Sequence, residues 1–132
     1  DVKEHKMDSE YFEIKSSLIE KIKETKESGK KVIAVGTTVT RALEGYFSGQ
    51  FSAFSSHEKV NGLIQGYTDI FIYSRYKFKA VDSLITNFHL PRSTPLMLAS
   101  AFCSFETLLK AYKEAIAMGY RFFSYGDAML IL

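Results

Sequence analysis

The sequence has no tryptophan, only two prolines and a single cysteine among its 132 residues. Cys103 therefore has no partner for an internal disulfide, which fits a protein of a reducing compartment such as the cytoplasm. No apolar run approaches the ~18 residues that a membrane-spanning helix needs, and the chain does not open on a secretory signal pattern. We therefore expect a cytoplasmic location and no membrane partner.

Several motifs of nucleotide and metal chemistry are also missing. The chain has neither the Gly-x-Gly-x-x-Gly of dinucleotide-binding turns nor the Gly-Lys-Thr that cradles phosphates in nucleotide hydrolases. One cysteine and three scattered histidines give no set with metal-ligand spacing, so we expect no bound metal. The net charge of +2 is too small to indicate a nucleic-acid partner and does not argue against one.

The chain does contain an alternation of strand-like and helix-like segments. An apolar share of 46% and a charged share of 24% are those of a folded domain, and 132 residues suit one domain. The patterns predict strands at 10–14, 31–35, 68–73, 81–88 and 128–132, and helices from 16 or 17 to about 28 and at 39–47, 96–103 and 105–118. The run at 31–35 is typical of a strand buried on both faces, and the polar segment 48–66 of a mobile loop. We expect an α/β fold, a three-layer α/β/α sandwich with a mostly parallel sheet.

Gly36, Thr37 and Thr38 stand where the strand at 31–35 gives way to a helix. Ligands of α/β proteins bind at the carboxyl ends of strands, and a helix N-terminus offers free N–H groups to an anion. Thr37 and Thr38 add hydroxyls, and Arg41 lies one turn further into the helix. The structural alternative is that one threonine caps the helix and Arg41 is solvated.

The densest polar cluster is the run from Asn87 to Thr94, between a predicted strand and a predicted helix. Asn87 and His89 alternate along an extended backbone and can face the same side. A histidine can move a proton near neutral pH, and Arg92 can hold a carboxylate or a phosphate. The alternative is a polar loop with Ser93 or Thr94 as a helix cap, which accounts for the hydroxyls better than for Asn87 and His89.

Two further segments carry weaker signals. Residues 75–79 alternate cations with aromatic rings, as nucleic-acid surfaces do, although an edge strand with one solvated face has the same pattern. Asp127 follows Gly126 in a turn-like sequence, where an aspartate is more often a turn former than a base.

Six stretches, taken in order, resemble one family. They are His-Lys-Met-x-Ser-Glu at 5–10, Ile-Ala-Val-Gly-Thr-Thr at 33–38, Asp-Ile-Phe-Ile-Tyr at 69–73, Tyr-Lys-Phe-Lys at 76–79, Leu-Ile-Thr-Asn-Phe-His-Leu-Pro at 84–91 and Arg-Phe-Phe-Ser-Tyr-Gly-Asp-Ala-Met-Leu-Ile at 121–131. The last two are highly specific strings. Over nearly its whole length the sequence resembles the S-adenosylmethionine:tRNA ribosyltransferase-isomerases of queuosine synthesis, the QueA family.

The resemblance implies a reaction. The ribosyl part of S-adenosylmethionine, the co-substrate, is transferred to 7-aminomethyl-7-deazaguanine in the wobble position of tRNA and isomerised to epoxyqueuosine. Adenine and methionine leave, and no metal or other cofactor takes part. The alternative from another class is a non-catalytic tRNA-binding or interaction fragment, which would bind RNA in a salt-sensitive way without S-adenosylmethionine.

The resemblance also implies an incomplete domain. Residues 1–132 are similar to the C-terminal part of the family's α/β domain, without its N-terminal strands and its inserted β-barrel, and Asp1 in place of Met agrees with this. Truncation exposes sheet edge and apolar surface, so we expect the chain alone to self-associate.

The implied reaction needs a base for a carbon acid, a proton donor for adenine, and anchors for the methionine and ribose groups. We assign proton transfer to His89, with Asn87 orienting it or holding a ribose hydroxyl, and the amino groups of the substrates to Glu10 or Asp127. The expected S-adenosylmethionine-binding residues are Gly36, Thr37, Thr38, Arg41, Arg92 and Ser93. The expected RNA-binding residues are Tyr76, Lys77 and Lys79. Many members read Pro-Gly where Ser74 and Arg75 stand, so Arg75 is not carried over.

Overall fold

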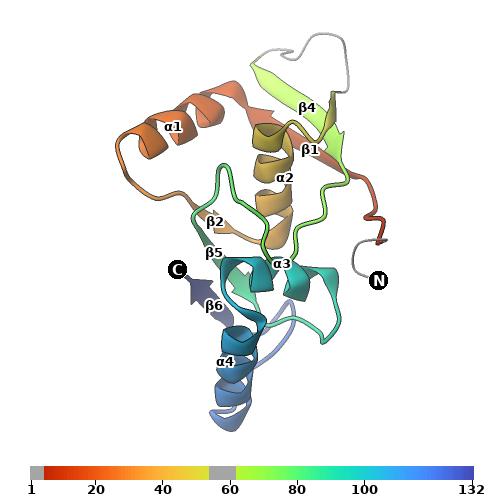
Figure 1. The fold of residues 1–132 in the computed structure, drawn as a ribbon, viewed down its shortest axis with the longest axis vertical. Helices are drawn as coiled ribbons and strands as arrows, with labels where there is room; N and C mark the ends of the chain where they lie inside the picture. The colour runs from red at the N-terminus through yellow and green to blue at the C-terminus, as the bar shows by residue number, and fades with distance from the viewer. Residues whose placement is uncertain (1–4, 54–61) are drawn as a thin grey trace.

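The strands of the chain form two separate three-stranded sheets (Figure 1), in a computed structural model that describes residues 5–53 and 62–132. In the first sheet, β4 (Leu63–Thr68) pairs antiparallel with β1 (Glu10–Lys15) and with the short β3 (Ser52–Ala53). In the second sheet, β5 (Ser83–Asn87) lies between β2 (Ile33–Val35) and β6 (Ala128–Ile131). β2 and β5 are parallel, and β5 and β6 are antiparallel.

This topology confirms mixed α/β content but corrects the expected sheet. Of the four strand pairings among the described residues, only that of β2 with β5 is parallel, so the prediction of a mostly parallel sheet is wrong. Hydrophobic pattern predicts strands without fixing their direction. β6 opposes β5 because the chain returns after the last helix to the carboxyl end of β5, where Ala128 pairs with Asn87. The three-layer sandwich is not confirmed within the described residues.

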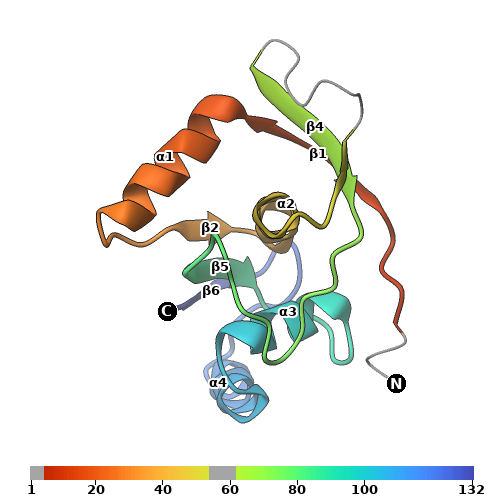
Figure 2. The same ribbon diagram turned by 45° about the horizontal axis from the view of Figure 1, so that its top comes forward.

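Helices pack on both sheets. The described residues contain α1 (Ser16–Glu27), α2 (Thr37–Ser48), α3 (Thr94–Phe102) and α4 (Phe105–Ala117). α2 lies between the two sheets (Figures 1 and 2), and its Leu43 joins a core with Phe12 and Ile64 of the first sheet. α3 and α4 pack on the second sheet, where Leu84 of β5 is fully buried. α2 therefore fixes how the two sheets meet.

The segments around β4 differ from expectation. Residues 48–66, predicted as a loop, include β3 and the first part of β4, while 54–61 lie outside the described residues. Gly66 lets β3 approach, since a Cβ there would lie 2.8 Å from the carbonyl oxygen of Ser52. The predicted strand at 68–73 belongs to β4 only at Thr68. Residues 69–73 pair with no described strand, although Ile70 and Ile72 are buried.

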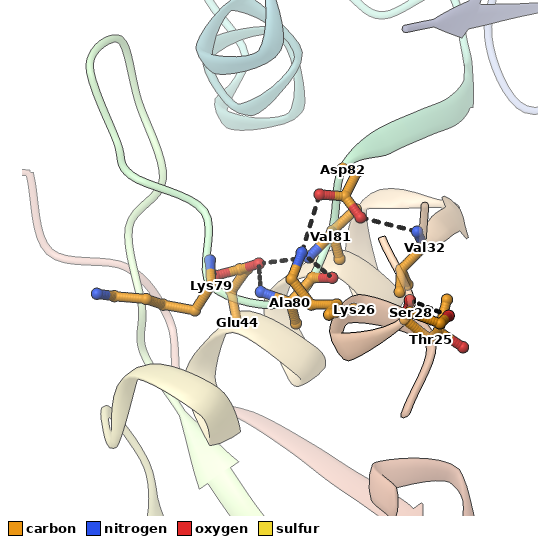
Figure 3. Close-up of polar contacts among 9 residues, drawn as sticks. All are labelled: Thr25, Lys26, Ser28, Val32, Glu44, Lys79, Ala80, Val81 and Asp82. Carbon is orange, nitrogen blue, oxygen red and sulfur yellow. Dashed lines mark hydrogen bonds and ion pairs between the residues drawn. The ribbon is translucent and has the colours of Figure 1, made fainter. Parts of the chain in front are cut away.

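A buried carboxylate holds the connection between β4 and β5 (Figure 3). Glu44 of α2 is fully buried and accepts hydrogen bonds from the backbone N–H groups of Lys79 (2.8 Å), Ala80 (2.9 Å) and Val81 (2.9 Å). It also accepts one from the Tyr76 hydroxyl at 3.0 Å. All four donors come from one irregular segment, so Glu44 satisfies backbone groups that no sheet partner serves.

Asp82 makes a second connection nearby (Figure 3). Its carboxylate accepts hydrogen bonds from the Lys26 ammonium at the end of α1 and from the backbone N–H of Val32, both at 2.8 Å. Partial burial favours the neutral acid, but these two hydrogen bonds outweigh it and lower the pKa of Asp82. The contact places the start of β2 beside the start of β5.

The second sheet buries only one of its faces. Ala34 and Leu84 point into the core, whereas Val35 is 65% exposed and Leu130 is 53% exposed, with Ile85 between them in register. The prediction that 31–35 is buried on both faces is therefore wrong for this chain. An exposed apolar face of this kind is what the expected self-association requires, and self-association stays a prediction.

Candidate functional site at the carboxyl ends of two parallel strands

The predicted site residues gather where β2 and β5 end. Because the two strands are parallel neighbours, their carboxyl ends lie at the same edge of the sheet, and Gly36 donates its N–H to Ile85 at 2.8 Å just beyond β2. Gly36 is the N-cap of α2 and has a φ of 97°, a conformation that favours glycine. Neither threonine is the cap, contrary to the structural alternative: Thr37 and Thr38 are the first two residues of the helix.

A first cavity, of about 190 Å³, opens between the N-terminal ends of α2 and α3. Thr37, Thr38 and Arg41 line one side of it, and Thr94 and Pro95 line another. Its remaining lining residues are Met7, Glu10, Phe71, Ile72 and Leu98. Four of the predicted site residues therefore share one small cavity.

Arg41 is held in the wall of the first cavity. Its side chain is 12% exposed, and its Nη1 donates to Glu10 Oε2 at 2.6 Å. The same guanidinium donates to the carbonyl oxygens of Ile70 (3.2 Å) and Asp8 (3.1 Å), and Thr38 donates its hydroxyl hydrogen to Glu10 Oε1 at 3.2 Å. The reading of Arg41 as a solvated side chain is wrong. The ion pair of Arg41 with Glu10 instead presents one fixed positive group and one fixed negative group to a ligand.

A second cavity, of about 240 Å³, adjoins the first. The two share Pro95, so they lie on either side of the start of α3. Asn87, His89 and Ser93 line the second cavity, and its other lining residues are Phe88, Leu90, Phe123 and Ser124. The predicted proton-transfer residues and the predicted binding residues are therefore brought into neighbouring cavities.

His89 is positioned through both its ring and its backbone. Its Nε2 lies 2.8 Å from the Thr86 hydroxyl, and its backbone N–H donates to the Tyr112 hydroxyl at 2.8 Å. Burial lowers the pKa of His89 below the ordinary value of about 6.5, so the imidazole is neutral at pH 7. No hydrogen bond joins Nδ1 to any described residue, which leaves one ring nitrogen able to exchange a proton with a ligand.

Asn87 and Asp127 make hydrogen bonds that hold the turn at 121–127, beside the site. The Asn87 side-chain amide donates to the carbonyl oxygens of Asp127 (3.2 Å) and Gly126 (3.4 Å). The Asp127 carboxylate accepts the backbone N–H of Arg121 at 2.7 Å, and this bond lowers the pKa of Asp127. Asp127 lines neither cavity, so the structure brings Glu10 to the candidate site and uses Asp127 to close the turn.

Two predicted binding residues have other contacts. Ser93 is the N-cap of α3: its Oγ accepts the N–H of Leu96 at 3.3 Å and donates to the Leu90 carbonyl at 2.7 Å. Ser93 therefore lines the second cavity while serving the helix. Arg92 is exposed, has a φ of 59° and lines neither cavity.

The predicted RNA-binding segment points its cations outward and its rings inward. Lys77 and Lys79 are exposed. Tyr76 donates its hydroxyl hydrogen to Glu44 and packs edge-on against Phe78 at 5.1 Å. Phe78 in turn stacks on Phe102 at 4.0 Å, so the cations are exposed while both rings are partly buried.

Sequence reasoning missed Phe71 and Phe123 as cavity-lining residues. Phe71 alternates with buried Ile70 and Ile72, and this alternation is a signal that its side chain faces away from the core. Phe123 reaches the second cavity through a turn in which its φ is 71°, and no sequence pattern predicts that.

Residues 5–53 and 62–132 contain neither a candidate metal site nor a candidate membrane span. In this part of the chain no group of three His, Cys, Asp or Glu side chains is placed to hold a metal ion. No helix there combines the length and the apolar character needed to cross a membrane.

Comparisons with known proteins identify the family. Residues 1–131 match the family model described as queuosine biosynthesis protein. The chain is 60% identical to the S-adenosylmethionine:tRNA ribosyltransferase-isomerase of Thermodesulfovibrio yellowstonii, across 99% of this chain and 37% of the relative. It is 59% identical to the protein of that name from Halothermothrix orenii, across 99% of this chain and 36% of the relative.

A solved structure agrees with these sequences. The crystal structure of S-adenosylmethionine tRNA ribosyltransferase from Thermotoga maritima matches with a TM-score of 0.77 and 44% identity, across 92% of this chain and 40% of that chain. The chain spans little more than a third of the length of the curated relatives that it matches. Because the match covers nearly every residue, the chain belongs to the family of queuosine biosynthesis proteins.

Proposed function

We propose that this chain is part of an S-adenosylmethionine:tRNA ribosyltransferase-isomerase. The ribosyl group of S-adenosylmethionine is transferred to 7-aminomethyl-7-deazaguanine in the wobble position of tRNA and isomerised to epoxyqueuosine, with loss of adenine and methionine. The observation that carries the proposal is the meeting of two cavities at Pro95, one lined by the Arg41–Glu10 pair and the other by His89. The names of the relatives agree with it.

The proposal extends to the organisation of the longer enzyme. Residues 1–132 are the C-terminal part of an α/β domain whose other strands, together with a β-barrel, lie elsewhere in the polypeptide. Support comes from the short span of the match and from the exposed face of the second sheet around Val35 and Leu130. Further chain on that face would complete a three-layer sandwich. The lone Cys103 fits a cytoplasmic enzyme.

The first cavity suits the amino-acid part of S-adenosylmethionine. The Thr37 hydroxyl and the first amides of α2, beyond Gly36, offer hydrogen bonds to a carboxylate, while the Thr38 hydroxyl holds Glu10. Glu10 offers a negative charge to an ammonium or sulfonium group. Because Arg41 already neutralises Glu10, the cavity has no unpaired charge before the ligand arrives, and a zwitterion preserves that balance. Ser93 lines the second cavity at the start of α3, and exposed Arg92 precedes it in the chain as a further candidate counter-charge.

The second cavity suits proton transfer. The neutral imidazole of His89 can remove the proton beside the sulfonium through Nδ1, since Nε2 is engaged by Thr86. The imidazolium so formed can give the proton to the departing adenine, and attack by the aminomethyl nitrogen and epoxide closure with loss of methionine follow. Asn87 holds the adjoining turn at Asp127, and exposed Lys77 and Lys79 suit phosphates of the tRNA.

A chimaera tests the activity. Residues 1–132 replace the matching 131 residues of the Thermodesulfovibrio yellowstonii relative, so that the rest of a full-length enzyme is present. With S-adenosylmethionine and tRNA carrying 7-aminomethyl-7-deazaguanine, we expect free adenine, measured by chromatography and mass spectrometry. We expect none when either substrate is left out or when the tRNA carries guanine instead. The unmodified relative is the positive control.

The outcomes separate two classes of function. A folded chimaera that binds tRNA but releases no adenine, beside an active control, would contradict the enzymatic proposal. It would favour the alternative of a non-catalytic tRNA-binding module, whose binding weakens steeply with salt and does not depend on S-adenosylmethionine.

A further inference from the structure

An aromatic ring stands free in solvent beside the second cavity. Tyr125 is 98% exposed, at the tip of the turn formed by residues 121–127. Its neighbours on the turn, Phe123 and Ser124, line the cavity that contains His89, and Phe123 is itself 52% exposed. Full exposure of a large ring contributes nothing to the burial that stabilises the fold, so folding alone does not account for Tyr125.

The turn that carries Tyr125 is braced at several points. The Asp127 carboxylate accepts the N–H of Arg121 at 2.7 Å, and the Asp127 N–H donates to the Arg121 carbonyl at 2.9 Å. Asn87 donates its amide hydrogen to the Asp127 carbonyl at 3.2 Å, and Phe123 donates its N–H to the Phe88 carbonyl at 3.0 Å. A ring on a turn fixed in this way loses little conformational freedom when a ligand stacks on it.

We propose that Tyr125 is a stacking platform for an unpaired nucleobase of the tRNA substrate, a neighbour of the base that enters the second cavity. The inference rests on the proposed function. Unpaired bases of RNA loops are bound by stacking on aromatic side chains, and such contacts need an open ring face. Tyr76, the aromatic residue expected to bind RNA, is less available than Tyr125, because it is partly buried, packs against Phe78 and bonds to Glu44.

The surroundings of Tyr125 favour RNA over a protein partner. Its neighbours Ser124 and Gly126 are polar or small, and the Arg121 side chain is 75% exposed. The face of the second sheet where further protein is expected instead exposes the apolar side chains of Ile33, Val35 and Leu130. Arg121, whose guanidinium lies 3.4 Å from the Asp127 carboxylate, adds an exposed cation to the same turn, and an aromatic ring with a nearby cation is typical of single-strand binding sites.

The test compares variants of the chimaera at one position. We expect Tyr125→Ala to weaken binding of an anticodon stem-loop carrying the target base by about tenfold, and to raise the KM for tRNA by a similar factor. Tyr125→Phe keeps the ring and retains binding, whereas Tyr125→Leu keeps apolar bulk and does not. The Kd is measured by fluorescence anisotropy over a range of salt concentrations. Its salt dependence stays unchanged, because stacking releases no counterions.

Phe105→Ala is the control, since Phe105 is another exposed aromatic residue (52%) and is the first residue of α4, outside the turn. It leaves the Kd for RNA unchanged. The KM for S-adenosylmethionine and the melting temperature do not change in Tyr125→Ala.

Three results would overturn the inference. One is an unchanged Kd for RNA in Tyr125→Ala, and a second is full binding by Tyr125→Leu. The third is a lowered melting temperature with a parallel loss of S-adenosylmethionine affinity, which would mean that Tyr125 packs against other protein. If the parent chimaera releases no adenine, the proposed enzymatic function fails by itself, and the stem-loop Kd values still decide the role of Tyr125.

Discussion

Replacement of His89 with alanine lowers the rate of adenine release by the chimaera by about 10²- to 10⁴-fold, the usual contribution of a positioned general acid or base. The ring is held by Thr86 at Nε2, Nδ1 bonds to no described residue, and His89 lines the second cavity. Alanine removes the proton acceptor, while the backbone N–H that bonds to Tyr112 remains. Adenine release in single-turnover reactions measures the effect, and a near-normal rate would contradict the assignment of His89.

The pH profile gives an independent check on His89. Only the neutral imidazole accepts a proton, and burial lowers its pKa below about 6.5. The rate therefore stays constant from pH 8 down to about that value and falls only on further acidification, with a slope set by one proton. Thr86→Val removes the hydroxyl that lies 2.8 Å from Nε2 but leaves the imidazole in place. It therefore lowers the rate less than His89→Ala does, and the rate still falls at low pH. A rate that does not fall on acidification would exclude His89 as the base.

Replacement of Glu44 with glutamine lowers the free energy of unfolding by about 2 to 4 kcal/mol. The amide keeps one acceptor oxygen but turns an N–H₂ group toward donors, so at least one of the backbone N–H groups at Lys79, Ala80 and Val81 loses its partner. An unsatisfied buried donor costs about 1–3 kcal/mol, and hydrogen bonds to a carboxylate are stronger than neutral ones. Because the segment is irregular, no sheet partner can replace the carboxylate.

Hydrogen exchange locates the effect of the Glu44 substitution. The amides of 79–81 exchange on the order of 10²-fold faster in Glu44→Gln, which corresponds to about 3 kcal/mol of lost protection. Tyr76→Phe removes only the hydroxyl donor and costs about 1 kcal/mol. Glu20→Gln, at an exposed carboxylate paired with Lys23, changes stability by less than about 0.5 kcal/mol. Equal stability of the Glu44 and Glu20 variants would show that the buried carboxylate does not hold this segment.

Local patterns predicted the helices and most strands because each carries its own periodicity. α4 is expected at 105–118 and observed at Phe105–Ala117, and β5 falls inside the predicted 81–88. Strand direction and pairing depend on contacts between distant residues. β1 pairs with β4 from Glu10 opposite Thr68 to Lys15 opposite Leu63. The sequence did not predict this pairing, because Gly62 and Gly66 are typical of a loop.

The candidate site was predicted only in part, because local patterns indicate strand ends but not contacts between distant residues. Two strand ends followed by helices indicated one ligand-binding edge, and Thr37, Thr38, Asn87 and His89 do line neighbouring cavities there. The contact between Arg41 and Glu10 joins residues 31 positions apart and has no local signature.

The RNA-binding prediction shows the same limit. The alternation at 75–79 correctly separates cations from rings, but only the burial of Glu44 in α2 explains why the ring of Tyr76 faces inward.

Hydrogen exchange of the chimaera with and without S-adenosylmethionine tests most directly whether the ligand binds at this edge of the second sheet. Mass spectrometry of peptides resolves the start of α2 from the segment between β5 and α3. We predict that S-adenosylmethionine slows exchange at 36–41 and 87–95, and leaves 16–27 of α1 and 105–117 of α4, which line neither cavity, little changed. Slower exchange confined to other segments, with none at 36–41 or 87–95, would contradict the assignment of both cavities.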